Sequence, residues 1–180
     1  MGAMVRTASQ QHASVLAAAA AGDEVAFRRL IAEHHDDMRR VARYVTRDGA
    51  LADDATQAAW VIAWKKLGNV RDEDHLRPWL VSVAANEAKR LLRRRRRWTD
   101  AEASADRVNG PDGIDPATDI ATLDLRDALG RLDPDDRALL AMRYVAGFDS
   151  TELAVATGIS ASGVRNRLER LRNRLRQELA

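Results

Sequence analysis

Residue types that recognise nucleic acid are concentrated in two separate stretches of this 180-residue chain. Residues 86–98 hold seven basic residues and one acid, and residues 160–180 hold six arginines and two glutamates. Arginine makes up 26 of the 29 basic residues, and its planar guanidinium suits phosphates and guanine edges better than lysine does. A solvated helix face explains most charge runs, but the run 93–97 would repel itself without a counter-charge. The two stretches therefore predict two contact points on a polyanion.

The second basic stretch has the layout of a helix-turn-helix. A short helix over residues 150–157 is followed by a turn at Gly158, and Ser160 caps a longer helix over residues 161–178. Ile159, between the two helices, is expected in the core. The longer helix, projected at about 100° per residue, turns an apolar stripe inward and a polar face outward.

The polar face of this longer helix holds the candidate base-reading residues. They are Ser162, Arg165, Asn166, Glu169 and Arg170. Asparagine pairs bidentately with adenine and arginine with guanine when such a helix enters the major groove. Three further arginines on the flanks are expected to meet phosphates; they are Arg167, Arg172 and Arg174. The alternative is an amphipathic helix with a solvated arginine face.

The first basic stretch lies on a helix expected over residues 75–97. One face of this helix holds Trp79, Asn86, Arg90, Arg93 and Arg97, and another holds Leu80, Ala84, Ala88 and Leu91. An aromatic ring, an amide and a row of guanidinium groups offer base stacking at one end and phosphate neutralisation along the rest. Packing in the core is an equal alternative for Trp79.

A helix expected over residues 50–67 is apolar on nearly all sides, which indicates a buried helix or one that binds a partner. One stripe holds Leu51, Ala55, Ala58 and Ile62, and the other side mixes Asp53, Asp54 and Gln57 with Trp60, Trp64 and Leu67. Burial is the commoner explanation for both tryptophans. The acidic edge is expected to be exposed.

Helical periodicity dominates the whole chain, which predicts an all-α fold. Further helices are expected over residues 13–21, 23–47, 119–131 and 134–146, with Asp23 and Asp133 as N-caps and Gly49 as a helix terminator. Residues 99–118 hold five acids, one base and many helix breakers, so they predict a flexible linker. The expected organisation is two small helical bundles, residues 13–98 and 119–178, joined by the acidic linker 99–118, the C-terminal bundle being a helix-turn-helix.

Catalytic and metal chemistry find little support in the sequence. The chain has no cysteine, which excludes disulfides and thiolate sites and fits a cytoplasmic location. His34 and Asp37 share a helix face, but catalytic zinc needs three protein ligands. Neither a glycine-rich phosphate loop nor a nucleophile elbow is present. We therefore expect no enzyme and no cofactor, and the absence of an 18-residue apolar run predicts no membrane span.

The order of motifs resembles bacterial sigma factors, and within them the extracytoplasmic-function (ECF) group. The matching motifs are Ala21-Gly22-Asp23, Ala52-Asp53-Asp54, Pro78-Trp79-Leu80, Leu132-Asp133-Pro134 and Gly158-Ile159-Ser160. The resemblance covers residues 13–178, and the combined order is far more specific than any single motif. This group keeps the second and fourth conserved sigma regions, which correspond here to the two predicted bundles.

The resemblance implies a chain that binds core RNA polymerase and directs it to promoter DNA. Region 2 would hold a coiled coil of the largest polymerase subunit through Asp53, Asp54, Gln57 and Trp60. Its next helix would open and read the −10 element with Trp79, Asn86, Arg90, Arg93 and Arg97. Region 4 would read the −35 element with the five base-reading residues and touch the polymerase flap. An anti-sigma factor is a further partner that the resemblance suggests.

Two other classes of protein share some of these features. A stand-alone helix-turn-helix transcriptional regulator would dimerise on a palindromic site, but the five-arginine run lies outside its reading domain and nothing resembles a ligand pocket. An RNA-binding or architectural protein would not need a well-formed recognition helix beside an acidic linker.

We predict that the free chain binds DNA weakly and with a strong dependence on salt. Extruding a base costs a few kcal/mol and stacking recovers roughly 1–3 kcal/mol per base, so polymerase contacts must supply the remainder. Fluorescence anisotropy with labelled promoter DNA at several salt concentrations measures this affinity. Nanomolar, sequence-specific binding without polymerase would contradict the prediction.

Overall fold

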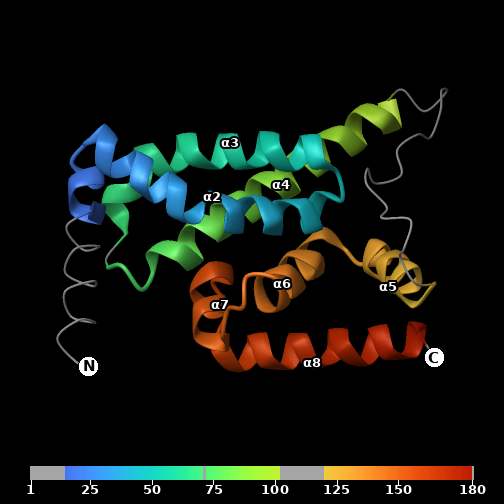
Figure 1. Cartoon of the computed structure of the whole chain (residues 1–180). Coiled ribbons are helices and arrows are strands. Elements are labelled where there is room, and N and C mark those ends of the chain that lie inside the picture. The colour runs from blue at the N-terminus through green and yellow to red at the C-terminus, as the bar shows by residue number, and fades with distance from the viewer. Residues whose placement is uncertain (1–14, 71, 102–119, 180) are drawn as a thin grey trace.

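The computed structural model describes residues 15–70, 72–101 and 120–179 (Figure 1), and within them it contains helices and no strand, which confirms the all-α prediction. Residues 15–20 are helical. The later elements are α2 (Glu24–Thr46), α3 (Gly49–Lys66), the 3-10 turn η1 (Leu67–Asn69), α4 (Leu76–Ala101), α5 (Ile120–Arg131), α6 (Pro134–Tyr144), α7 (Ser150–Thr157) and α8 (Ala161–Glu178). Helix α4 includes the first residues of the predicted linker, and the rest of that linker lies outside the described residues.

Short polar side chains begin the helices, largely where the sequence predicts them. Asp23, Asp133 and Ser160 accept backbone hydrogen bonds as N-caps of α2, α6 and α8. Gly158 ends α7 in the left-handed conformation, with φ 72°, which glycine adopts without steric cost.

The junction between α2 and α3 corrects one prediction. Gly49 does not terminate α2 but lies inside α3, whose N-cap is Asp48. The residue that ends α2 is Arg47, with a φ of 59°. The left-handed turn therefore falls on arginine, because the aspartate is needed to cap the next helix.

Three helices, α2, α3 and α4, form the N-terminal bundle (Figure 1). The expected inner face of α4 holds for Leu80, Ala84 and Ala88, which are fully buried, whereas Leu91 is only partly buried against the core. The expected stripe of α3 is partly wrong, because the buried face consists of Ala52, Ala55, Thr56, Ala59, Trp60 and Ala63. Small alanines let α3 approach α2 and α4 closely. Side-chain size, and not hydrophobicity alone, therefore determines which face of α3 is buried.

The C-terminal bundle places α7 and α8 as a helix-turn-helix over α6. Val164, Leu168 and Leu171 of α8 are buried beside Leu153 of α7. Ile159 does not enter this core as expected, because 38% of it is exposed. Among the described helices, none has both the length and the apolar composition that crossing a bilayer requires.

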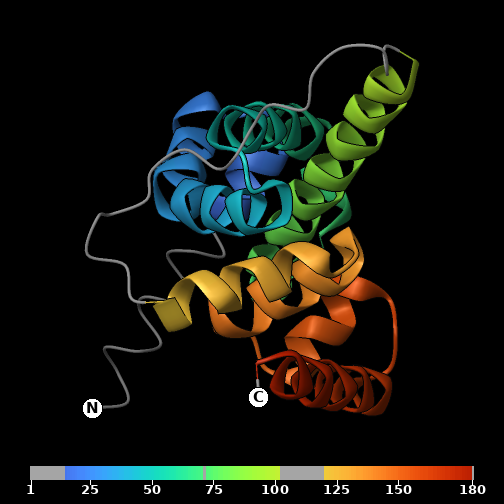
Figure 2. The same ribbon diagram turned by 90° about the vertical axis from the view of Figure 1, so that its right-hand side faces the viewer.

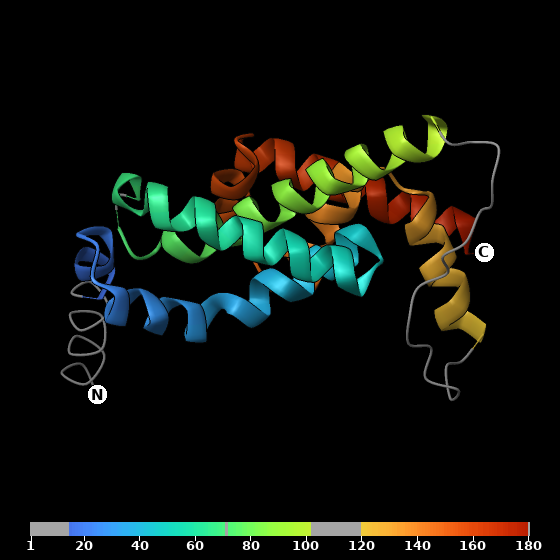
Figure 3. The same cartoon turned by 90° about the horizontal axis from the view of Figure 1, so that it is seen from above.

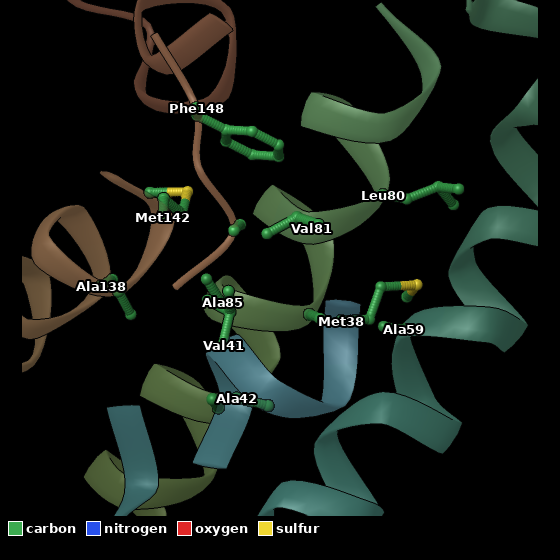
Figure 4. Close-up of a cluster of buried hydrophobic side chains, with 14 of the residues drawn as sticks. Met38, Val41, Ala42, Ala59, Leu80, Val81, Ala85, Ala138, Met142 and Phe148 are labelled. Atoms are coloured by element: carbon green, nitrogen blue, oxygen red, sulfur yellow. The ribbon is translucent and has the colours of Figure 1, made fainter. Parts of the chain in front are cut away.

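The two bundles pack against each other, which the sequence does not predict (Figure 2). Helix α6 lies on α2, and α7 lies on α4. Figure 4 shows the shared apolar cluster, in which Phe148 and Met142 face Val81, Ala85 and Val41 from the other bundle. Phe148 is fully buried, so one continuous core joins the two halves of the chain.

A polar joint surrounds this shared core. The Arg77 guanidinium lies 4.7 Å from the centre of the Phe148 ring and donates to the Ala146 carbonyl (2.6 Å) and to Asp37 (2.7 Å). Lys89 of α4 pairs with Asp135 of α6 at 2.7 Å. These contacts hold α4 against the loop and the helix that flank Phe148.

Arg137 is a buried cation within the same joint. Its guanidinium donates to the carbonyls of Leu132 (2.8 Å), Val45 (3.1 Å) and Gly130 (3.3 Å), and Val45 belongs to the other bundle. Burial, together with nearby arginines, lowers the pKa of Arg137 from its ordinary value. The three carbonyls replace the water that this guanidinium loses on burial.

We predict that Phe148→Ala lowers the free energy of unfolding by about 3–5 kcal/mol, because it leaves a cavity where the two bundles meet. Phe148→Leu should lower it by less, since most of the volume remains. Val155→Ala, at a side chain that is 41% exposed, is the control and should stay within about 0.5 kcal/mol. Urea unfolding followed by circular dichroism measures all three, and equal stability of Phe148→Ala and the wild type would contradict the shared core.

Candidate nucleic-acid interface

The outer face of α8 presents the predicted base-reading residues together. Ser162, Arg165, Asn166, Glu169 and Arg170 are all exposed. Ser160 supports the start of the helix, where its hydroxyl accepts from the backbone N–H of Gly163 at 3.1 Å. The exposed amide and guanidinium groups therefore begin within the first two turns of a capped helix, as a major-groove reading helix requires.

The inner face of α8 fixes the direction of this surface. Its apolar side chains are buried, and Arg167 forms an ion pair with Asp136 of α6, with nitrogen–oxygen distances of 2.8 and 2.6 Å. Burial raises the pKa of Asp136 even though Arg167 opposes that shift. The expectation that Arg167 meets phosphate is therefore corrected, since this guanidinium positions the helix. Arg174 is likewise paired, with Glu178 at 3.0 Å.

The outer face of α4 presents a second basic surface. Asn86, Arg90, Arg93 and Arg97 are exposed. Trp79 is half-buried and packs against the core. A hydrogen bond from Arg90 to Glu87 (2.7 Å) raises the pKa of that arginine. Asn86 and the three arginines are therefore exposed on this face, as the sequence predicts. Trp79 differs from them, because it contributes largely to packing.

One member of the five-arginine run points back to the bundle. The Arg95 guanidinium lies 2.6 Å from the Asp48 carboxylate. Hydrogen bonds from the Leu51 backbone and from Arg95 lower the pKa of Asp48, although burial opposes them. The remaining arginines of the run, 93, 94, 96 and 97, stay exposed.

Asn86 lies beside the C-terminal bundle. A hollow of about 150 Å³ is lined by Asn86 and Lys89 from α4, by residues of α6, α7 and α8 such as Asp135, and by Ile159 from the turn between α7 and α8. The exposed Ile159, expected in the core, thus faces this hollow. The base-reading face of α8 is not part of the hollow, so the two basic surfaces differ in their surroundings.

The acidic edge of α3 carries three of the four predicted polymerase-binding residues at the surface. Asp54 and Gln57 are exposed, and Asp53 pairs with Arg39 at 2.5 Å, which lowers the pKa of that aspartate. Trp60 is buried, stacks edge-to-face on Phe27 and donates to His35. The prediction for Trp60 is therefore corrected to a core role, because its indole is covered by α2.

The weak metal candidate of the sequence has another structural use. Asp37 accepts hydrogen bonds from Arg40 and Arg77. Burial raises its pKa, but the two arginines outweigh this effect and lower it. Within the described ranges no group of three or more His, Cys, Asp or Glu side chains could hold a metal ion.

Sequence reasoning missed the residues of the joint, Arg77, Arg137 and Phe148, and the exposed Trp98. Phe148 lies in a short loop between α6 and α7, where no helical period marks it as core. Trp98 follows the arginine run directly, so aromatic type and adjacency to a basic run were the signal that could have identified it.

Comparison with known proteins assigns both bundles to described families. Residues 30–98 match the family described as Sigma-70 region 2, and residues 122–175 match the family described as Sigma-70, region 4. The chain is 32% identical over 160 residues to the RNA polymerase sigma factor CarQ of Myxococcus xanthus, covering 88% of this chain and 91% of CarQ. It is 30% identical over 167 residues to the ECF RNA polymerase sigma factor SigM of Mycobacterium tuberculosis, covering 92% and 83%.

Solved structures show the same two-bundle fold. CnrH, solved in complex with the cytosolic domain of CnrY, matches with a TM-score of 0.66 and 26% identity over 92% of this chain and 94% of that one. The sigma factor RpoE of Bartonella quintana, solved with the anti-sigma factor NepR, matches with a TM-score of 0.69 over 85% and 96%. At 22% identity, RpoE supports the fold alone.

We predict that Arg165→Ala and Asn166→Ala each reduce preference for the bases that they read by about 5- to 150-fold, the equivalent of roughly 1–3 kcal/mol per bidentate contact. Selection from a library randomised at the upstream promoter element, in the presence of polymerase, measures the preference. Asn173→Ala and Arg176→Ala, at exposed positions two to three turns later on α8, are matched controls. An unchanged upstream preference in the first two variants would refute this assignment.

Proposed function

The chain belongs to the extracytoplasmic-function group of RNA polymerase sigma factors and directs transcription initiation, and we propose how its two bundles divide this work. Residues 13–98 act as region 2, which binds core polymerase and the −10 element. Residues 119–178 act as region 4, which binds the −35 element, and residues 99–118 connect them. The observation that carries this proposal is the pair of exposed basic faces on two different helices, α4 and α8.

The surface for core polymerase lies on α3. Asp54 and Gln57 are exposed there, and Asp53 is held at the same edge by Arg39. A carboxylate and amide edge over a rigid, alanine-packed helix suits a basic partner surface. We assign it to the coiled coil of the largest polymerase subunit, as the family resemblance implies, and we assign the flap contact to region 4.

The two bundles pack against each other, and we call this the closed arrangement. It affects how the chain can open DNA. Asn86 of α4 shares its hollow with α6 and α7, and Lys89 is engaged by Asp135. Promoter DNA cannot occupy the same space, so the bundles must separate before this part of α4 reads the −10 element. This requirement gives the predicted weak DNA binding of the free chain a structural cause.

A protein inhibitor is a further proposed partner. CnrH was solved with a protein partner and matches this chain across both bundles. An anti-sigma factor that binds both bundles in the closed arrangement would keep α4 from DNA. The chain itself acts in the cytoplasm as a non-catalytic initiation factor, a proposal that fits its cysteine-free sequence and the absence of catalytic motifs.

Transcription reconstituted from purified core polymerase, the full chain and a library of promoter DNA tests this function. We predict run-off transcripts that require the chain, and a strong loss for the double variant Asp54→Ala/Gln57→Ala through weaker core binding. Asp36→Ala, at an exposed acid on α2, is the control and should transcribe like the wild type. Specific DNA shifts without polymerase, together with no chain-dependent transcript, would instead favour the stand-alone regulator.

A further inference from the structure

Trp98 is a large aromatic side chain that the fold does not use. It lies near the end of α4 and is 59% exposed. The other tryptophans have structural contacts: Trp60 and Trp64 stack edge-to-face on Phe27, and Trp79 packs against the core. Trp98 has no such ring contact among the described residues and belongs to no apolar cluster there. An exposed indole of this kind indicates a binding role rather than a packing role.

The surroundings of Trp98 are strongly basic. Together with Arg90, Arg94 and Arg97 it lines an open hollow of about 400 Å³, and the side chains that the structure describes around this hollow include no acid. The four residues share one face of α4, because Arg94, Arg97 and Trp98 follow Arg90 by four, seven and eight positions. We call this group the Trp98 cradle. Figure 3 shows that the last turns of α4 extend past the end of α3.

The arginines of the cradle are not equivalent. Arg90 pairs with Glu87, and the Arg97 side chain donates to the Arg93 carbonyl at 3.4 Å. Arg94 is exposed and forms no ion pair within the described residues. Its guanidinium is therefore the group most ready to bind an anion beside the indole.

We propose that the Trp98 cradle binds one nucleotide of promoter DNA, with its phosphate on Arg94 and its sugar or base on the indole of Trp98. A planar ring beside guanidinium groups matches both parts of a nucleotide, since aromatic faces stack on bases and arginine pairs with phosphate. The polymerase surface is a less suitable occupant, because the described lining of the cradle has three arginines and no acid, a charge balance that favours a polyanion. This inference rests on the proposed −10 role of α4 and extends it.

The helix geometry also predicts where this nucleotide lies. Trp98 is twelve residues after Asn86, which corresponds to about 18 Å along the axis of α4. At about 3.4 Å per nucleotide of a strand, this distance spans about five nucleotides. The cradle is therefore expected to contact a nucleotide about five positions away from the base that Asn86 reads.

Holoenzyme assembled from core polymerase and the full chain tests the cradle. We expect Trp98→Ala to reduce heparin-resistant promoter complexes about ten-fold and Trp98→Phe to stay within about two-fold of the wild type, because phenylalanine still stacks. Arg94→Ala should weaken binding and reduce the slope of log affinity against log salt by about one. Arg28→Ala, at an exposed arginine on α2, is the matched control.

A neutral methylphosphonate linkage locates the phosphate. Placed singly along the promoter, it should weaken the wild-type complex about five positions from the base at Asn86 and have no further effect in Arg94→Ala. Templates in which the nucleotide at this position is base-paired or unpaired distinguish a contact of the indole with the base from a contact with the sugar. A larger Trp98→Ala defect on the unpaired template assigns the base to the indole, and an equal defect assigns the sugar of the duplex.

Three results would overturn the cradle. The first is an unchanged yield of promoter complexes with Trp98→Ala. The second is a defect in Arg94→Ala when no single methylphosphonate position weakens the wild-type complex. The third is an equal loss in Trp98→Ala and Trp98→Phe that follows weaker binding to core polymerase, which would mark a polymerase contact. Quenching of indole fluorescence by a single-stranded oligonucleotide, compared between the free wild type and Trp98→Phe, tests the cradle without transcription. Failure of the proposed function would instead appear as no chain-dependent transcript while this Trp98-dependent quenching persists.

Discussion

Burial of the inner face of α4 is the constraint on which both the fold and the proposed DNA surface depend. Leu80, Ala84 and Ala88 are fully buried against the N-terminal bundle, and Val81 and Ala85 are buried against the C-terminal one. A helix covered on two sides can turn only its remaining side to solvent. That side carries Asn86 and the exposed arginines 90, 93, 94, 96 and 97, so packing within the protein decides which residues are available for the proposed DNA contact.

Carboxylates divide the many arginines into structural and available ones. Asp37 engages Arg77, Asp48 engages Arg95, and Asp136 engages Arg167. These ion pairs stabilise the joints between helices, and for Asp37 and Asp48 the lowered carboxyl pKa means that this stability is present at neutral pH and is lost as the pH falls through the folded-state pKa. Arginines without such a partner in the described part of the chain stay at the surface, where like charges repel until a polyanion neutralises them.

Periodicity and capping residues were sufficient to predict the helices and the helix-turn-helix, because these signals are local. Asp23, Asp133 and Ser160 cap the helices that they precede, and the exposed face of α8 follows from its apolar stripe. The contact between the bundles was not predictable in this way. Phe148 lies in a loop flanked by Gly147 and Asp149, and only the tertiary structure supplies its pocket. Trp60 shows the same limit, since a helical projection cannot tell which of two apolar sides a neighbour covers. Ile159 lies in the turn between α7 and α8, where no helical period applies.

The packing of the two bundles against each other makes the two proposed DNA surfaces unequal. The base-reading side chains of α8 lie outside the hollow between the bundles, whereas Asn86 lines it. The joint beside Asn86 combines one apolar cluster with polar contacts such as Lys89–Asp135, whose aspartate is largely exposed. The polar contacts exchange their partners for water at modest cost, whereas separating Phe148 from its pocket exposes apolar surface to water. The cost of opening therefore lies mainly in the shared apolar cluster, and binding energy from polymerase and from the proposed −35 contact of α8 would have to meet it before α4 reaches DNA.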